Sequence, residues 1–167
     1  MSVRQLSKLG ILGLLFVSFT VNAQEMNKPA PACNIEPFQG GNAGSIQQFK
    51  GKVVYVDFWA SWCSSCAESF PFLDMLQEQY QSQGLHIVAI NMDENIEDAK
   101  DFLAKFSPKF MVVTNKDQQC AINFAVEAMP SSYLIDKKGN IRYAHIGFRA
   151  GETEELKKKV EQLLSEN

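Results

Sequence analysis

The sequence lacks both an excess of positive charge and an apolar run long enough to cross a membrane. Its 167 residues hold 16 Lys and Arg against 19 Asp and Glu, a formal net charge of −3. That balance provides no basic surface for nucleic acid or an anionic membrane, so we expect no nucleic acid partner. The longest apolar stretch, residues 9–21, has thirteen positions, whereas a spanning helix needs roughly 20.

Further absences indicate that the chain has one domain and no nucleotide cofactor. The sequence has no internal repeat, no low-complexity tract and no Gly-rich motif for a nicotinamide or flavin nucleotide. With 46% hydrophobic and 21% charged residues, the chain has the composition of one globular domain with a core of its own.

The first residues have the pattern of a secretory signal peptide. Arg4 and Lys8 precede the apolar stretch, and Val-Asn-Ala ends it at Ala23. We predict a signal peptide over residues 1–23, with cleavage after Ala23 and a periplasmic location. An uncleaved anchor is the alternative. Cleavage would leave 14 basic against 19 acidic residues.

The residues after the signal peptide divide into two parts. Residues 24–32 are polar with two prolines and predict a flexible lead-in, and residues 33–167 form the predicted domain. Within it, residues 33–52 suggest a small hairpin or edge strand. Further strands are predicted by β-branched and aromatic runs at 53–58, 85–91, 110–113, 132–135 and 141–146. Helical spacing predicts helices between Cys63 and Gly84, between Asn95 and Pro108, over 117–124, and from Glu154 onward. This alternation predicts an α/β fold, a three-layer sandwich around a mixed sheet.

Cys63 and Cys66 form the one C-x-x-C pair of the sequence, with Ser64 and Ser65 between them. Half a zinc site would need two further ligands, and no second pair exists: the remaining candidates are the single residues Cys33, Cys120, His86 and His145. A purely structural disulfide across so short a loop would remove little unfolded-chain entropy. We therefore predict redox chemistry and no metal.

The position of the pair assigns each cysteine a role. Cys63 follows a predicted buried strand and opens a helix, where unpaired backbone N–H groups stabilise a thiolate and lower its pKa. We predict that Cys63 is the nucleophile. Cys66 lies one turn later on the apolar face and is predicted to resolve the mixed disulfide.

These residues resemble a known family. V-D-F-W-A-S-W-C-S-S-C followed by Pro71 is similar to the thioredoxin active site. Residues from about 30 to 165 resemble the exported TlpA/ResA-like thiol-disulfide oxidoreductases, through the N-terminal segment, residues 88–94 and residues 129–141. The resemblance implies a thioredoxin-like fold with an N-terminal extension, and neither a metal nor an organic cofactor.

The resemblance also implies roles for five residues outside the cysteine pair. It implies a cis Met129–Pro130 bond that leaves the Met129 backbone free to pair with a partner, and an exposed Trp62 for the same partner. Asp57 and Glu94 match carboxylates that exchange a proton with the second cysteine. The alternatives are a trans proline opening a strand, an Asp57 carboxylate reaching water, and a solvated Glu94.

Cys33 and Cys120 have two possible states. In an oxidising compartment they can pair into a structural disulfide that ties the N-terminal segment to the domain. Alternatively, Cys120, which lies among apolar residues, is an ordinary buried thiol.

The predicted function is reduction of disulfides in exported proteins, including those of cytochrome c or metal-site maturation. Ser64 and Ser65 bring no positive charge beside Cys63, which favours a reductase over a strong oxidant. The enzyme would be a monomer that receives electrons from a membrane-bound thiol donor. The alternatives are a disulfide oxidase or isomerase using the same cysteines, and a chaperone-like binding module.

Overall fold

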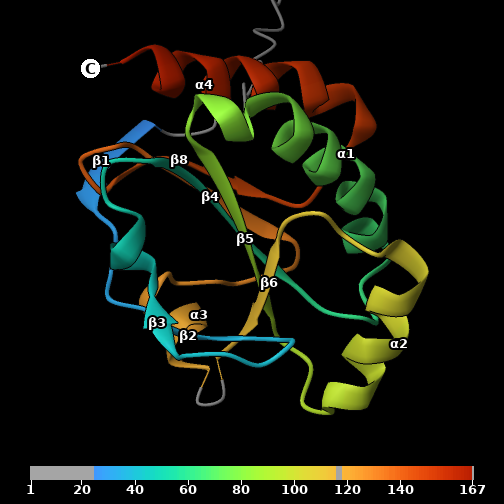
Figure 1. Ribbon diagram of the computed structural model, residues 1–167. Coiled ribbons are helices and arrows are strands. Elements are labelled where there is room, and N and C mark those ends of the chain that lie inside the picture. The colour runs from blue at the N-terminus through green and yellow to red at the C-terminus, as the bar shows by residue number, and fades with distance from the viewer. Residues whose placement is uncertain (1–24, 116–117, 167) are drawn as a thin grey trace, which may run out of the picture.

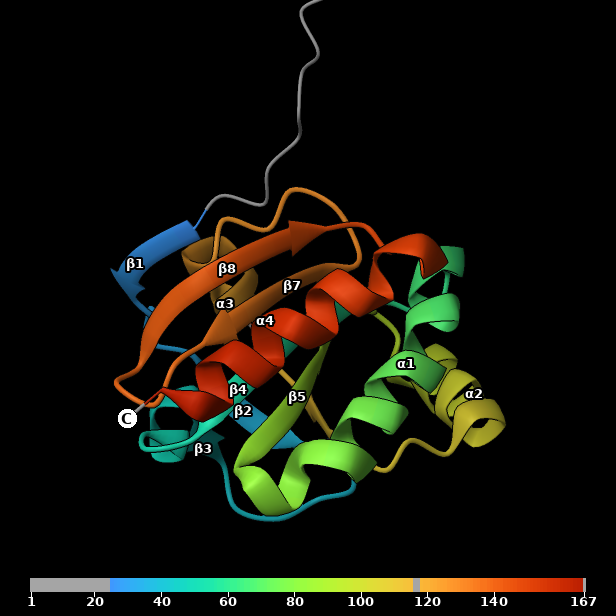
Figure 2. The same ribbon diagram turned by 90° about the horizontal axis from the view of Figure 1, so that it is seen from above.

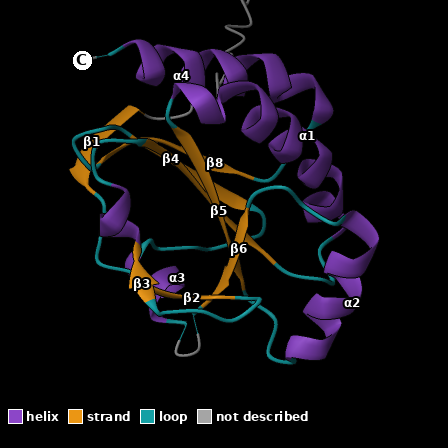
Figure 3. Cartoon of the chain, in the orientation of Figure 1, coloured by secondary structure: helices purple, strands orange, loops and turns teal. Residues whose placement is uncertain are grey.

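The computed structural model describes residues 25–115 and 118–166, which fold around one twisted, eight-stranded sheet (Figure 1). The strand order is β1-β8-β7-β4-β5-β6-β2-β3. The strands are β1 (Glu25–Pro29), β2 (Asn34–Pro37), β3 (Gly44–Ser45), β4 (Val53–Trp59), β5 (Leu85–Asn91), β6 (Met111–Thr114), β7 (Ser131–Ile135) and β8 (Asn140–Ile146). The α-helices are α1 (Ser64–Tyr80), α2 (Ile96–Phe106), α3 (Gln119–Asn123) and α4 (Thr153–Ser165). Short 3-10 turns η1 (Ile46–Phe49), η2 (Gln81–Gln83) and η3 (Ala150–Glu152) join them, and Figure 3 shows these elements by type.

Strand β4 lies in the middle of the sheet and all of its residues are buried. It runs parallel to β5 and antiparallel to β7, while β5 also pairs in parallel with β6. A strand covered on both faces must be apolar on both, which explains its run of β-branched and aromatic residues. The predicted mixed sheet is therefore confirmed.

The two faces of the sheet carry separate cores. Tyr55 and Trp59 point toward α1, α2 and α4, whereas Val54, Val56 and Phe58 point toward α3 and the N-terminal segment. Figure 2 shows α1, α2 and α4 together on one side of the sheet and α3 on the other. This alternation follows from the two-residue period of a strand and produces the predicted three layers.

Residues 25–29 differ from the prediction of a flexible lead-in over 24–32. They form β1, antiparallel to β8, with Lys28 opposite Ile141 and Pro29 opposite Asn140. Without β1 the edge of β8 would expose unpaired backbone groups. A proline-containing segment suits this place because an edge strand tolerates a missing N–H. The predicted signal peptide, residues 1–23, lies outside the described residues.

The shortest helix and the N-terminal hairpin lie close to their predicted places. The helix expected over 117–124 is the shorter α3, and β2 with β3 forms the expected N-terminal hairpin. Within the described ranges, none of the helices combines the length and apolar character that a membrane span requires.

Candidate active site

Cys63 and Cys66 lie where the chain leaves β4 and enters α1, and they form a disulfide with a Cα–Cα distance of 5.3 Å. Cys63 is the N-cap of α1, and its Sγ accepts a hydrogen bond from the Cys66 backbone N–H at 3.2 Å. Cys63 is 7% exposed and Cys66 is 0% exposed. Of the two sulfurs, that of Cys63 is therefore the more accessible to another molecule.

The loop before the pair is held by an acid that sequence reasoning missed. The backbone N–H and the hydroxyl of Ser61 both donate to the Asp93 carboxylate, at 2.9 and 2.8 Å. Asp93 also accepts from Asn91 Nδ2 at 2.6 Å, which ties the carboxylate to the end of β5. Its position two residues after the end of the predicted strand 85–91 was the available signal. Trp62, the residue between Ser61 and Cys63, is 70% exposed.

The Met129–Pro130 peptide bond is cis. Pro130 is buried, and the half-buried Met129 packs against the hydrophobic cluster that contains both Cys63 and Cys66. The Pro130 carbonyl accepts from Gly147 N–H at 2.7 Å. Within residues 25–115 and 118–166, no hydrogen bond involves the backbone N–H or carbonyl of Met129.

Asp57 is 1% exposed, so its carboxylate does not reach water. It lies on the same face of β4 as Tyr55 and Trp59, which belong to the cluster containing Cys66. Oδ1 accepts from the Ser132 hydroxyl at 2.8 Å, and Oδ2 is buried with no hydrogen-bond partner among the described residues. Burial raises the pKa of Asp57 to about 7, against a smaller lowering by Ser132. The carboxyl can therefore exchange a proton near neutral pH.

Glu94 has a different environment. Its side chain is exposed, in the loop just before Asn95, the N-cap of α2. This exposed position matches the solvated alternative considered for Glu94.

Cys33 and Cys120 form a second disulfide on the opposite face of the sheet, with a Cα–Cα distance of 4.9 Å. Both residues are buried. Asn115 completes the connection, since its Nδ2 donates to the Asn34 carbonyl at 2.7 Å and its Oδ1 accepts from the Cys120 N–H at 2.8 Å. The N-terminal segment is thus joined covalently to α3.

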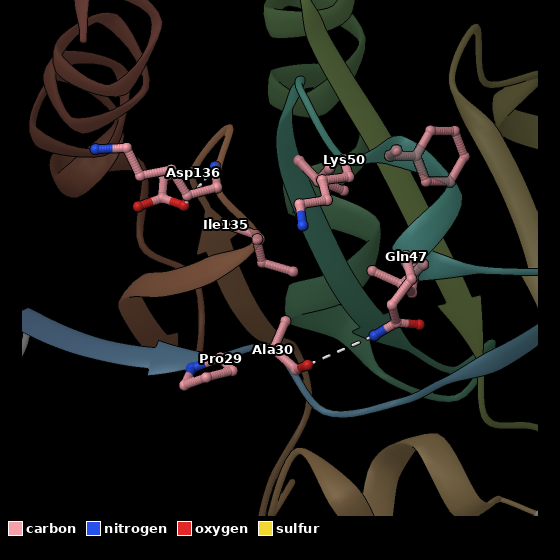
Figure 4. A pocket seen from close by; sticks show the side chains of 11 residues that line it. Pro29, Ala30, Gln47, Lys50, Ile135 and Asp136 are labelled. Carbon is pink, nitrogen blue, oxygen red and sulfur yellow. Dashed lines mark hydrogen bonds between the residues drawn. The ribbon is translucent and has the colours of Figure 1, made fainter. Parts of the chain in front are cut away.

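A separate cavity of about 210 Å³ lies on this same opposite face (Figure 4). Ala30, Gln47, Lys50 and Ile135 contribute to its wall, and none of the site residues predicted from sequence does. Among the described residues, we find no group of three or more His, Cys, Asp or Glu side chains arranged to hold a metal ion.

The fold and the cysteine pair together define a class of protein. A cysteine pair that begins a helix after a central strand, with a cis proline directly before the neighbouring strand β7, is the arrangement of a thioredoxin-fold thiol-disulfide oxidoreductase. The chain belongs to the Redoxin family, which it matches over residues 25–164.

Relatives agree with this assignment and place the chain among the TlpA/ResA-like proteins. The thiol-disulfide oxidoreductase ResA of Bacillus thuringiensis subsp. konkukian is 32% identical over 117 residues, 70% of this chain and 67% of that protein. ResA of Bacillus anthracis is 30% identical over 135 residues, covering 80% and 78%. A Chlorobium tepidum crystal structure assigned as thiol:disulfide interchange protein DsbE has a TM-score of 0.80 and 33% identity, covering 86% of this chain and 100% of that one.

Proposed function

We propose that the protein reduces disulfides of exported proteins by dithiol-disulfide exchange through Cys63 and Cys66. The observation that carries this proposal is the place of Cys63 at the N-cap of α1, with the Cys66 N–H 3.2 Å from its sulfur. A backbone donor and the positive end of a helix both stabilise a thiolate. The greater accessibility of Cys63 supports the same assignment.

The reaction proceeds in two exchanges. The Cys63 thiolate attacks one sulfur of the substrate disulfide, a mixed disulfide forms, and the first substrate thiolate leaves and takes up a proton. Cys66 then gives its proton to the buried Asp57 carboxylate and attacks the Cys63 sulfur. The Cys63–Cys66 disulfide closes, the second substrate thiolate leaves, and two electrons have passed to the substrate.

Two features support a docking site for the substrate protein. Trp62 offers an exposed ring directly before Cys63. The N–H and carbonyl of Met129, which have no partner among the described residues, can pair with an extended segment of the substrate. Main-chain pairing tolerates many sequences, which suits an enzyme that acts on several proteins.

The direction of electron flow rests on the residues between the cysteines. The Ser65 hydroxyl lies 3.6 Å from Cys63 Sγ and can donate to a thiolate, but neither Ser64 nor Ser65 carries a charge. A moderately stabilised thiolate favours a reductant. We propose that removal of residues 1–23 leaves a monomer of residues 24–167 in the periplasm, without a metal or organic cofactor. A membrane-bound thiol donor would re-reduce it, and its substrates would include proteins of cytochrome c or metal-site maturation.

The reduction potential of the Cys63–Cys66 couple tests the direction. We expect a value near that of thioredoxin, about −270 mV, when the couple is equilibrated in thiol redox buffers and the thiols are counted by alkylation and mass. A value near that of a dedicated oxidant, about −120 mV, would contradict the reductase and favour the oxidase or isomerase. The matched control is the double variant Cys63→Ser with Cys66→Ser, in which only the Cys33–Cys120 pair can contribute to the count.

A further inference from the structure

A row of three polar side chains crosses the sheet from the buried carboxyl of Asp57 toward the protein surface. In the strand register, Asp57 on β4 lies opposite Ser132 on β7, and Ser132 lies opposite His145 on β8. Directly opposite residues have Cβ atoms about 4.5–5.5 Å apart, on one face of the sheet. The next row on this face is apolar or aromatic, and consists of Tyr55, Leu134 and Tyr143. The polar row is therefore a distinct feature of this core.

A short contact is found at each end of the row. At the buried end the Ser132 hydroxyl donates to Asp57 Oδ1 at 2.8 Å. At the outer end His145 Nε2 lies 3.2 Å from Glu152 Oε2, an ion-pair distance, and both atoms are buried without a hydrogen-bond partner among the described residues. Glu152 in turn pairs with Arg149 at 2.8 Å, and the Arg149 side chain is 75% exposed. The row thus runs from a fully buried carboxyl to Glu152, whose partner Arg149 is an exposed side chain.

The middle of the row borders a small cavity. It has a volume of about 10 Å³, and Tyr55, Ser132, His145 and Lys159 contribute to its wall. A cavity of about this volume accommodates a single water when two or more polar groups face it. Such a water would bridge the Ser132 hydroxyl and the His145 imidazole, both of which can donate and accept a hydrogen bond.

We propose that Ser132 and His145 form the path by which the proton of the Asp57 carboxyl exchanges with solvent. The proposal deepens, and rests on, the proposed role of Asp57 as acceptor of the Cys66 proton. The proton of the Asp57 carboxyl passes to Ser132 Oγ while the hydroxyl proton of Ser132 moves to His145. His145 then gives a proton to the Glu152 carboxylate, which releases it to solvent. Only O–H and N–H bonds form and break along this path. No electron is transferred. Ser132 and His145 act through Asp57 and are positioning residues.

The groups around the row are compatible with this role. His145 faces Glu152 and Arg149 from the turn before α4, and Lys159 and Glu155 from α4 itself. Burial lowers the pKa of His145, and the charge of Glu152 opposes that lowering. The imidazole is therefore neutral at neutral pH and can accept a proton. At the other end, the Asp57 carboxyl faces Tyr55, whose own pKa burial raises.

The test is the oxidation of the reduced protein by an excess of the chromogenic disulfide dithionitrobenzoate. Attack by Cys63 releases the first coloured thiolate, and attack by Cys66 releases the second in a unimolecular phase. At about pH 6 most Asp57 carboxyls hold a proton that must leave before Cys66 can be deprotonated, whereas at about pH 9 the carboxyl is already ionised. We expect Ser132→Ala and His145→Ala to slow the second phase about tenfold at the lower pH and to match the unmodified protein at the higher pH.

Matched variants separate a proton path from a structural effect. Ser132→Thr keeps a hydroxyl and should retain the second-phase rate, and free imidazole should restore the rate of His145→Ala. His86→Ala changes the other histidine and should alter nothing. Equal slowing at both pH values, or no slowing at about pH 6, overturns the path. If Asp57→Asn leaves the second phase unchanged, the role of Asp57 fails as well; if Asp57→Asn slows it and the path variants do not, only the path fails.

Discussion

The two disulfides lie on opposite faces of one sheet and differ in almost every physical respect. Cys63 and Cys66 are separated by 3 positions in the sequence, and Cys33 and Cys120 by 87. By loop-closure entropy the short loop would stabilise the fold by about 2 kcal/mol and the long one by about 4 to 5 kcal/mol. Both pairs are buried, but Cys63 keeps 7% of its surface exposed beside the 70% exposed Trp62, whereas Cys33 and Cys120 keep 2% and 0%. A disulfide bond therefore serves reactivity on one face of the sheet, and a second disulfide bond serves stability on the other face.

The polar groups of the two faces differ in the same way. Beside Cys120, the Asn115 side chain has partners for both its amide nitrogen and its oxygen. On the helix-covered face, Asp57 keeps one buried oxygen without a partner among the described residues, and burial raises its pKa to about 7. An unpartnered buried carboxyl lowers stability in exchange for proton chemistry. The reactive face thus retains an energetic cost that the other face lacks.

The largest expected effect is the loss of catalysis in Cys63→Ser. Without the attacking sulfur the mixed disulfide cannot form, so insulin-reduction activity should fall to the rate without enzyme, while the free energy of unfolding should fall by no more than about 2 kcal/mol. Cys120→Ser is the matched control and should retain activity. If Cys63→Ser reduces insulin at an undiminished rate, the assignment of the nucleophile is wrong; a chaperone-like module would keep its affinity for partners in this variant.

A second prediction concerns the long disulfide. The double variant Cys33→Ala with Cys120→Ala should lose about 2 to 5 kcal/mol of unfolding free energy, because the unfolded chain regains the entropy of an open loop. Denaturant titration measures this loss, and insulin reduction at low temperature should stay within about twofold of the parent protein. A parallel loss of activity and stability would show that the two faces are not independent.

A third prediction is a gain of stability in Asp57→Asn that depends on pH and disappears near pH 4. The pKa of this carboxyl rises from 3.8 to about 7 on folding. The protonated carboxyl is therefore favoured in the folded state, and the protein loses stability as pH rises from about 4 through about 7. At about pH 8 the asparagine variant should gain at most about 4 kcal/mol, and near pH 4 almost nothing.

Thermal unfolding across this pH range measures the Asp57 prediction. Glu94→Gln is the control for removal of a negative charge, because Glu94 is exposed. It should change stability by no more than about 0.5 kcal/mol at any of these pH values. A gain for Asp57→Asn that is the same at both ends of the range would contradict the raised pKa.

Sequence reasoning succeeded wherever the signal was local. The buried run of β4, the N-cap of α2 at Asn95 and the helix that begins after Cys63 each depend on residues within a few positions of one another. Such patterns follow from backbone period and capping chemistry, which the order of residues contains directly. The C-x-x-C pair belongs to this group, because its place between a strand and a helix is itself a local pattern.

The remaining features needed the tertiary structure, because they join residues far apart in the chain. The Ser132–Asp57 hydrogen bond spans 75 positions, the Asp93–Ser61 contact spans 32, and Cys33 meets Cys120 across 87. The edge strand β1 likewise exists only because β8 offers it an open edge. By itself the sequence determined which sulfur begins the helix, since capping is local. Strand register decided which carboxyl lies buried on the same face as the cysteine pair and which side chains connect it to solvent, because register is set by the packing of the whole sheet.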